Sequence, residues 1–504
     1  MQRTNILDYL EEGAALHPRK IAFSNGTDSL SFSQLRRAID GVGSFLIEKG
    51  YKKEPVVVFM EKHPKCVAAF FGVVAGGCYY VPLDDEMPAH RIELIFNTLK
   101  PRAVICDGKT KDTAAQFAKE AATYMYDDVC DTKPDKKALE NIREKSLDTD
   151  PIYIVFTSGS TGVPKGVCAC HRSVIDYIEN LSETLGFDEN TVFGNQTPLY
   201  FDACLKELYP TLKFGATTYL IPKPLFMQPV KLVEFLNEHK INTVCWVVSA
   251  LTVISSLGAF KEVTPKYLHT IAFGSEVFPV KQLRLWQQAC PKAAFTNLYG
   301  PTECTGMSCF YHVERDFELD ESIPIGRPFK NTEIMLLDDN NKPVADGEMG
   351  EICIRGTCVT LGYYNDERTK DSFVQNPLND KYPELIYKTG DLARYNKRGE
   401  LEFAGRKDYQ IKHMGHRIEL GEIELIADMA QGVEDACAIF DEEKKKIVLF
   451  YVGSAEKAEV ISFMKSKLPR YMIPNAVVPM ESFPHTPNGK MDRKTIKADY
   501  LANR

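Results

Sequence analysis

The 504-residue sequence lacks several features that would assign it to a specialised class of protein. No segment approaches the run of about 18 apolar residues that a membrane-spanning helix requires. Lys and Arg together number 61 against 69 Asp and Glu, and the formal charge of −8 offers no field that would attract a polyanion. We therefore expect neither a membrane span nor a nucleic-acid partner.

Signals for export and for disulfides are also absent. The first ten residues lack the basic and apolar regions of a secretory signal, and an acidic residue already stands at Asp8. The 14 cysteines follow no framework spacing and never form a Cys-x-x-Cys pair. Cys309 and His312 have a Cys-x-x-His spacing without a second pair nearby, so packing is favoured over zinc binding. We expect a cytoplasmic protein with reduced, mostly buried thiols.

The composition that is present, 44% hydrophobic and 26% charged, is typical of a large globular protein. A chain of this length exceeds the size of one hydrophobic core and predicts at least two folding units. Short apolar runs alternate with amphipathic stretches: strands are predicted at 55–60 and 103–106, with a helix at 63–75 between them. Further strands are predicted at 217–221, 243–248 and 270–273. This alternation predicts mostly parallel sheets covered by helices.

The pattern changes in the last third of the chain. From about residue 323, closely spaced short strands and turn signals predict a β-rich subdomain at about 323–405. A final segment of about a hundred residues has strand and helix patterns of its own. We predict an α/β protein with a large N-terminal domain of layered sheets and helices at 1–407, which includes the β-rich subdomain. A small, mobile α+β C-terminal domain is predicted at 408–504.

The most informative local segment is a glycine-rich loop that follows a predicted strand. Glycines let backbone amides approach an anion, hydroxyls donate further hydrogen bonds, and a lysine supplies a positive charge. The spacing is not the GxxxxGK[ST] of a P-loop. From these residues alone, phosphate binding and an ordinary flexible turn are equal alternatives. The candidate phosphate ligands are Thr157, Ser158, Gly159, Ser160, Thr161, Gly162 and Lys165.

Further motifs follow this loop in order along the chain. They are Tyr-Phe-Asp-Ala at 200–203, Asn-Leu-Tyr-Gly-Pro-Thr-Glu at 297–303, Tyr-Lys-Thr-Gly-Asp-Leu at 387–392, Gly-Arg-Lys-Asp at 405–408 and Pro-Asn-Gly-Lys at 487–490. With the loop, this ordered set resembles the adenylate-forming enzymes over essentially the whole chain. The sequence is most similar to the amino-acid adenylation domains of nonribosomal peptide synthetases and to the D-alanine:carrier-protein ligases.

The resemblance implies a site for ATP and Mg²⁺. Asp391 would accept the ribose hydroxyls, Glu303 would be the magnesium ligand, and Lys490 would hold the α-phosphate and the substrate carboxylate. Lys490, Thr302 and Glu303 would form the catalytic group. Taken one at a time, these motifs are equally compatible with ordinary turns. The other implied ATP contacts are Asn297 at the adenine amino group, Tyr299 packed on the nucleotide, Gly300 beside it, Thr302 at the α-phosphate, and Arg406 at the ribose or phosphates.

Asp202 is the main argument for an amino-acid substrate. At this place amino-acid-activating members of the family keep a carboxylate that pairs with the substrate's α-ammonium group, although an aspartate there could also cap a helix. Large pocket walls favour a small side chain such as alanine or D-alanine, whereas an inward-pointing Lys206 would favour an acidic amino acid. The implied pocket residues are Ala203, Lys206, Trp246, Ile271, Phe273, Leu298, Gly306 and Met307.

The resemblance also implies a moving domain and a protein partner. Asp408 matches the hinge about which the C-terminal domain rotates between two half-reactions. Because the chain ends ten residues after Lys494, we expect a free-standing monomer that delivers the activated amino acid to the phosphopantetheine of a carrier protein in trans. This is an AMP-forming ligase that makes a carbon–sulfur bond. The alternatives are a carboxylic acid–coenzyme A ligase and a non-catalytic carrier-docking protein.

Overall fold

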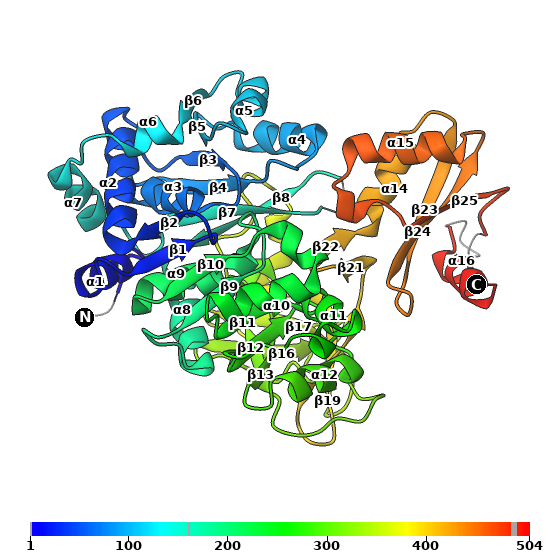
Figure 1. Ribbon diagram of the computed structural model, residues 1–504. Helices are drawn as coiled ribbons and strands as arrows, with labels where there is room; N and C mark the ends of the chain where they lie inside the picture. The colour runs from blue at the N-terminus through cyan, green and yellow to red at the C-terminus, as the bar shows by residue number, and fades with distance from the viewer. Residues whose placement is uncertain (1–2, 160–161, 485–490, 504) are drawn as a thin grey trace. The chain divides into compact units, whose positions relative to one another are not determined.

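The computed structural model describes residues 3–159, 162–484 and 491–503 (Figure 1). The chain divides into two compact units. The first comprises Met1–Asp85, Leu99–Phe156 and Gly166–Lys407, and the second comprises Glu86–Thr98, Thr157–Lys165 and Asp408–Arg504. The second unit thus begins its long segment at Asp408, and it also takes in two short segments that we had assigned to the N-terminal domain.

Two large sheets form the framework of the first unit, and both are mainly parallel. One has nine strands in the order β15 (Arg327–Pro328), β14 (Cys309–His312), β13 (Ala294–Tyr299), β12 (Thr270–Gly274), β11 (Thr243–Val247), β9 (Val192–Asn195), β10 (Thr217–Leu220), β1 (Ile21–Ser24) and β2 (Ser29–Ser31). The other has six in the order β6 (Ala122–Met125), β5 (Ala103–Cys106), β3 (Pro55–Phe59), β4 (Tyr79–Leu83), β7 (Pro151–Thr157) and β8 (Lys165–Cys170).

The predicted strands and helix are confirmed with small shifts at their ends. Strands β3, β5, β11 and β12 are buried at every position, as expected for parallel strands that are covered on both faces. Helix α3 (Pro64–Ala75) begins with proline at its first turn and is buried along most of its length. The charged segment 127–150 contains α7 (Lys136–Lys145), which has no buried residue.

Helices cover both faces of the nine-stranded sheet. One apolar cluster takes its residues from α1 (Asp8–Leu16), α2 (Phe32–Glu48), α3, α8 (His171–Leu185) and α9 (Leu205–Phe214). A second cluster takes them from α10 (Pro229–Glu238), α11 (Val248–Ser256) and α12 (Val280–Ala289), which lie together in green in Figure 1. Shorter helices of this unit are α5 (Lys111–Phe117), α6 (Tyr126–Cys130) and α13 (Thr369–Ser372).

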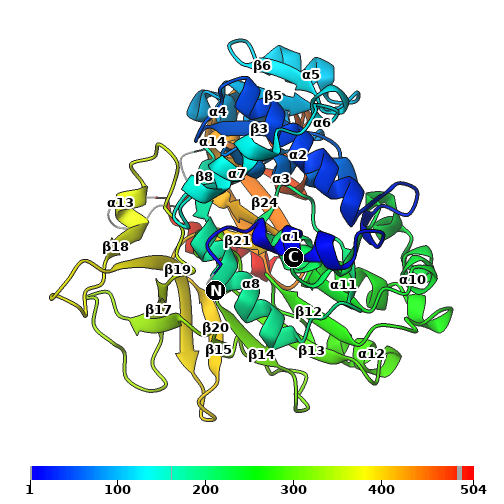
Figure 2. The same ribbon diagram turned by 90° about the vertical axis from the view of Figure 1, so that its left-hand side faces the viewer.

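The predicted β-rich part of the first unit is a five-stranded antiparallel sheet, drawn in yellow in Figure 2. Its central strand β19 pairs with β17, β18 and β20, so the Thr-Gly-Asp motif on β19 is enclosed by neighbouring strands. The strands are β16 (Thr332–Leu337), β17 (Gly350–Gly356), β18 (Phe373–Gln375), β19 (Leu385–Tyr395) and β20 (Leu401–Arg406).

The long segment of the second unit has its own α+β core. Its strands are the hairpin β21 (Gln410–His413) and β22 (His416–Glu419), and a sheet of β23 (Val433–Asp441), β24 (Lys446–Gly453) and β25 (Ala476–Met480). Its helices are α14 (Leu420–Asp428), α15 (Lys457–Lys467) and α16 (Arg493–Ala502), and α4 (Ala89–Leu99) belongs to it through residues 89–98. An apolar cluster joins α14 and α15 to β23 and β24.

No helix in the described part of the chain combines the length and the apolar character needed to cross a membrane.

Candidate active site

The motif at 297–303 runs from the end of β13 into a short 3-10 helix, η4 (Thr302–Cys304). Gly300 lies at this bend, where a Cβ atom would stand 2.5 Å from the Cα of Met307. Only glycine therefore allows the returning chain to pass so close. The bend places Thr302 and Glu303 just beyond the carboxyl end of a parallel strand, which is the edge where α/β sheets form ligand sites.

Thr302 brings the second predicted motif into the same place. Its side chain lies close enough to the carboxyl group of Asp202 to lower the pKa of that group. Asp202 opens the 3-10 helix η1 (Asp202–Cys204) ahead of α9. Burial is the largest cause of a raised pKa for Asp202, and the nearby Glu303 carboxylate adds to it. The Thr302 side chain, the charge of Lys206 and the backbone N–H of Ala203 act in the opposite direction.

Glu303, the predicted magnesium ligand, is fully buried. The hydroxyl of Tyr363 donates a hydrogen bond to its Oε1 at 2.7 Å. No cluster of three or more His, Cys, Asp or Glu suited to a metal occurs among the described residues. Mg²⁺ commonly uses only one or two protein carboxylates and takes its other oxygens from phosphates and water, so a single buried carboxylate is a compatible ligand. Tyr363 orients Glu303 and was not identified from the sequence, where it lies 60 positions away.

Asp391, the predicted ribose ligand, contacts Tyr299 of the motif at 297–303. The Tyr299 hydroxyl donates to Asp391 Oδ2 at 2.5 Å, and burial is the main reason that the pKa of Tyr299 is raised. Arg406 stands opposite Asp391 in the register of β19 and β20, and its guanidinium pairs with Oδ1. Both carboxylate oxygens of Asp391 therefore already accept hydrogen bonds within the protein. Each keeps further lone-pair capacity, which is what a ribose hydroxyl would use.

The residues predicted to line the substrate pocket lie on two opposite faces of the nine-stranded sheet. Leu298 and Met307 belong to the cluster that contains α8 and α9, whereas Trp246 and Phe273 pack in the cluster that contains α10 to α12. Successive residues of a strand point to opposite faces, and Phe273 aligns with Trp246 and Asn297 rather than with Leu298. The structure does not bring these two aromatic residues together with Leu298 and Met307. Ile271 lies with Trp246, while Ala203 is half-buried beside Asp202, and Gly306, with a positive φ, precedes Met307.

Lys206 points into the protein rather than out to solvent. Its residue is 2% exposed on α9, and its charge is felt by Asp202, Glu207 and Cys245. No carboxylate of the described residues lies within 4.0 Å of its ammonium group. Its charge is therefore held close to Asp202 without an ion-pair partner in the part of the chain that the structure describes.

Two ionisable residues near this part of α9, the buried Glu207 and the half-buried Lys62, were missed in the sequence. Glu207 is fully buried, and burial raises its pKa to about 8. Lys62 donates to the carbonyl oxygens of Asn195 and Gln196 at 3.0 Å each, and burial lowers its pKa to about 7. The adjacent charged pair Lys206–Glu207 within an apolar helix was the available signal. For Lys62 no local pattern exists.

The glycine-rich loop lies in the second unit. The Ser158 hydroxyl donates to the carbonyl of Arg417 at 2.9 Å. The backbone N–H of Gly159 lies close enough to the Glu422 carboxyl group to lower its pKa. Thr157 keeps a buried hydroxyl that has no hydrogen-bond partner within the described ranges. Lys165 is 9% exposed, and Gly162 has a φ of +75°. Ser160, Thr161 and Lys490 lie outside the described residues, and Asp408 is exposed at the start of the C-terminal segment.

Comparison with known proteins identifies the family. The chain matches the AMP-binding enzyme model at residues 10–364 and the AMP-binding enzyme C-terminal domain model at 422–490. It is 32% identical over 98% of its length to a dimodular nonribosomal peptide synthase of Bacillus subtilis (strain 168), covering 21% of that protein. It is 29% identical over its whole length to tyrocidine synthase 1 of Brevibacillus parabrevis, covering 46% of that protein. The chain thus spans less than half the length of these relatives.

Among solved structures, holo-PA1221 is a nonribosomal peptide synthetase protein that contains adenylation and PCP domains and is bound to a vinylsulfonamide inhibitor. The chain is 25% identical to it with a TM-score of 0.83, over 98% of this chain and 84% of that one. IdnL1 is 26% identical with a TM-score of 0.81, over 96% of this chain and 100% of that one. The chain belongs to the AMP-binding enzyme family, within the adenylate-forming superfamily.

Proposed function

We propose that this protein activates an amino acid with ATP and transfers it, as a thioester, to the phosphopantetheine of a carrier protein in trans. In the first step a substrate carboxylate oxygen attacks the α-phosphorus of ATP, and the bond to the β-phosphate oxygen breaks to release pyrophosphate. In the second step the carrier thiol attacks the acyl carbon and AMP leaves. The thiol proton is released to solvent.

The observation that carries this proposal is that Asp202, Thr302 and Glu303 lie close together, since both Thr302 and Glu303 affect the pKa of Asp202. Asp202 would pair with the α-ammonium group of the substrate, which places the substrate carboxylate near the threonine that precedes Glu303. Mg²⁺ held by Glu303 would neutralise phosphate charge. Lys490 would stabilise the charge that builds between the two anions.

The proposal that a carrier protein accepts the amino acid is based on similarity to a solved structure. The related solved structure holo-PA1221 contains an adenylation domain and a PCP domain in one protein. This favours a carrier thiol over free coenzyme A as the acceptor. Incubating the charged enzyme with a holo carrier protein or with coenzyme A, and measuring the thioester by mass spectrometry, distinguishes the two.

Amino-acid-dependent exchange between ATP and pyrophosphate tests the first step. We expect exchange with at least one amino acid among both enantiomers of the common set. Asp202→Asn should reduce it by at least about a hundredfold, because the substrate ammonium group loses its charged partner. Asp112→Asn is the control, since Asp112 is an exposed carboxylate on α5. Equal exchange by the Asp202 and Asp112 variants would exclude the assigned role.

For the substrate side chain we propose an acidic amino acid ahead of alanine. The argument is the buried ammonium group of Lys206, which lies near Asp202 and has no ion-pair partner among the described residues. A substrate side-chain carboxylate would supply that partner. We expect Lys206→Met to raise the KM for aspartate or glutamate by at least about tenfold. Exchange with alanine alone, unaffected by Lys206→Met, would favour the small-residue alternative.

A further inference from the structure

The side-chain amide of Asn297 is held in one orientation. Its Nδ2 donates to the carbonyl of Pro324 at 2.9 Å and lies 3.5 Å from the carbonyl of Ile323. Because both neighbours are acceptors, the nitrogen must face them, and Oδ1 must face the other way. No donor among the described residues hydrogen-bonds to that oxygen. The arrangement therefore presents an acceptor at the end of β13.

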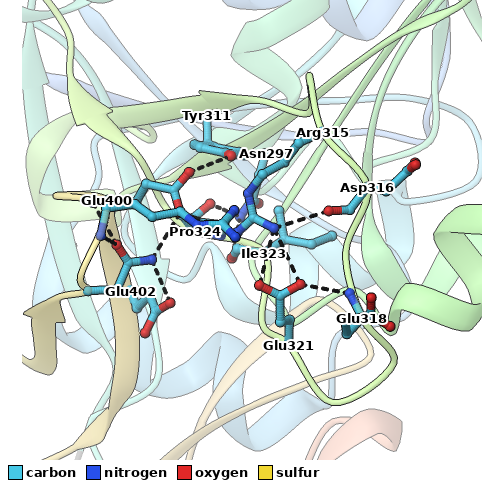
Figure 3. Close-up of polar contacts among 12 residues, drawn as sticks. Asn297, Tyr311, Arg315, Asp316, Glu318, Glu321, Ile323, Pro324, Glu400 and Glu402 are labelled. Atoms are coloured by element: carbon cyan, nitrogen blue, oxygen red, sulfur yellow. Dashed lines mark hydrogen bonds and ion pairs between the residues drawn. The ribbon is translucent and has the colours of Figure 1, made fainter.

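Arg315 holds the segment that carries these two carbonyls (Figure 3). Its Nη1 contacts the carboxylate oxygens of Glu321 at 3.1 and 3.3 Å, two residues before Ile323. Its Nη2 reaches Glu400 Oε2 at 3.2 Å. The guanidinium group also lies over the ring of Phe317, with its central carbon 3.8 Å from the ring centroid. One arginine thus joins the segment 313–324 to the turn before β20.

The same network returns to Asn297 through the sheet. Tyr311 donates its hydroxyl to Glu400 Oε1 at 2.7 Å, and Tyr311 is the direct cross-strand partner of Asn297 in the pairing of β13 with β14. On the far side of Pro324, the N–H of Ile325 donates to the carbonyl of Leu401 at 2.8 Å. The two carbonyls that orient the amide are therefore fixed from both directions.

The charges of this network are suited to that task. Burial opposes ionisation of Glu400, but hydrogen bonds from Asn396, Tyr311 and Arg315 outweigh it and lower the pKa of Glu400. The backbone N–H of Glu318 is the largest cause of a lowered pKa for Glu321. Both glutamates are therefore ionised at neutral pH, and Arg315 pairs with two full negative charges.

We propose that Arg315 is a positioning residue for selection of the nucleotide base. By fixing the carbonyls of Ile323 and Pro324, it holds Asn297 Oδ1 as the acceptor for the exocyclic amine of adenine. A base with a carbonyl in that place, such as guanine, would set two acceptors against each other. This inference rests on the proposed function, because it takes ATP as the nucleotide.

The test compares ATP with purine riboside 5′-triphosphate, which lacks only the exocyclic amine. We expect the native protein to bind ATP about five- to tenfold more tightly, the value of one well-placed hydrogen bond. In Arg315→Ala the amide can rotate, so this preference should fall to within about twofold through weaker ATP binding. In amino-acid-dependent exchange the KM for ATP should rise while kcat stays within about twofold.

Two further variants keep the test decisive. Glu321→Gln removes one charge with little change of shape and should give an intermediate preference, and it replaces Arg315→Ala if that protein does not fold. Arg355→Ala is the control, because Arg355 pairs with Glu333 and Glu384 in the β-rich sheet. Unchanged preference in folded Arg315→Ala or Glu321→Gln overturns the inference.

Binding and exchange separate the inference from the proposed function. Calorimetric binding of the two nucleotides requires no turnover. Loss of the preference in the Arg315 variant with no exchange by the native protein would support the inference and refute the proposed reaction. Exchange by the native protein together with equal affinity for both nucleotides would support the proposed reaction and refute the inference about Arg315.

Discussion

Glu207, which is buried, and Lys62, which is half-buried, place two ionisable groups near the proposed substrate site. Each has a pKa displaced toward its neutral form, to about 8 for Glu207 and about 7 for Lys62, with burial as the main cause. Burying the charged forms costs folding free energy, so the protein retains these groups against its own stability. Groups of this kind are frequent at functional sites.

The pH dependence of stability provides a test of Glu207. Its folded pKa lies above the unfolded value of 4.5, so its stabilising effect is complete below about pH 4.5 and is lost as pH rises toward 8. Glu207→Gln cannot ionise and should lack this loss. We expect the variant to gain on the native protein by a few kcal/mol in free energy of unfolding between pH 5 and 8.

Urea denaturation at the two pH values measures the difference. Glu434→Gln is a suitable control, because Glu434 is exposed. Parallel pH profiles for the native protein and the Glu207 variant would show that the carboxyl group ionises normally in the folded state.

At the scale of elements, helices α2 and α3 pack closely because glycine stands at the contact. A Cβ atom on Gly72 would lie 2.4 Å from the Cβ of Val42. Gly72→Ala should therefore destabilise the protein by about 1–3 kcal/mol, although alanine favours a helix more than glycine does.

Gly108 provides a matched comparison. A Cβ atom added there would have no neighbour within 4 Å, and its φ is not positive. Gly108→Ala should leave the free energy of unfolding within about 0.5 kcal/mol. A similar small effect at Gly72 in urea denaturation would mean that the two helices can separate without cost.

The strands were predictable because their signal is local. A short apolar run such as 103–106 predicts a buried parallel strand, whatever position that strand takes in the sheet. The motif order predicted that Asp202, Thr302 and Glu303 belong to one site, and in the structure Thr302 and Glu303 both lie close enough to Asp202 to affect its pKa. The division of Trp246 from Leu298 could not be seen, because the face of each residue depends on register between strands.

Contacts between distant segments were also beyond the sequence. Tyr363 orients Glu303 across 60 positions, and Arg315 reaches Glu400 across 85. Neither pair has a spacing that a helix or hairpin would impose. Such partners are set by topology, and only the folded chain identifies them.

In the whole molecule, the second unit joins segments from three parts of the sequence. Arg91 of α4 pairs with Glu422 of α14 at 2.9 Å, and both side chains are at most 6% exposed. The backbone N–H of Gly159 in the glycine-rich loop lies close enough to the same carboxyl group to lower its pKa. The loop amide that we assign to phosphate thus already lies beside an acidic group of the protein.

This arrangement makes a prediction for ATP binding. Glu422→Gln weakens the competing acceptor and leaves Arg91 with uncompensated charge, so the apparent Kd for ATP should fall by about three- to tenfold. Isothermal titration calorimetry measures it, with Glu434→Gln as the exposed control. An unchanged Kd in a folded Glu422 variant would show that phosphate does not use the Gly159 amide.

The contact between Gly159 and Glu422 has one further consequence. When two acceptors compete for one donor, the interaction of the donor with one acceptor reduces the binding free energy of the other. A triphosphate bound at the loop would then loosen Arg91 and α14 by the same amount that Glu422 weakens the triphosphate. Glu422 would then interact with the loop amide whenever no nucleotide is bound. Nucleotide binding would therefore be thermodynamically linked to the packing of the segment that begins at Asp408.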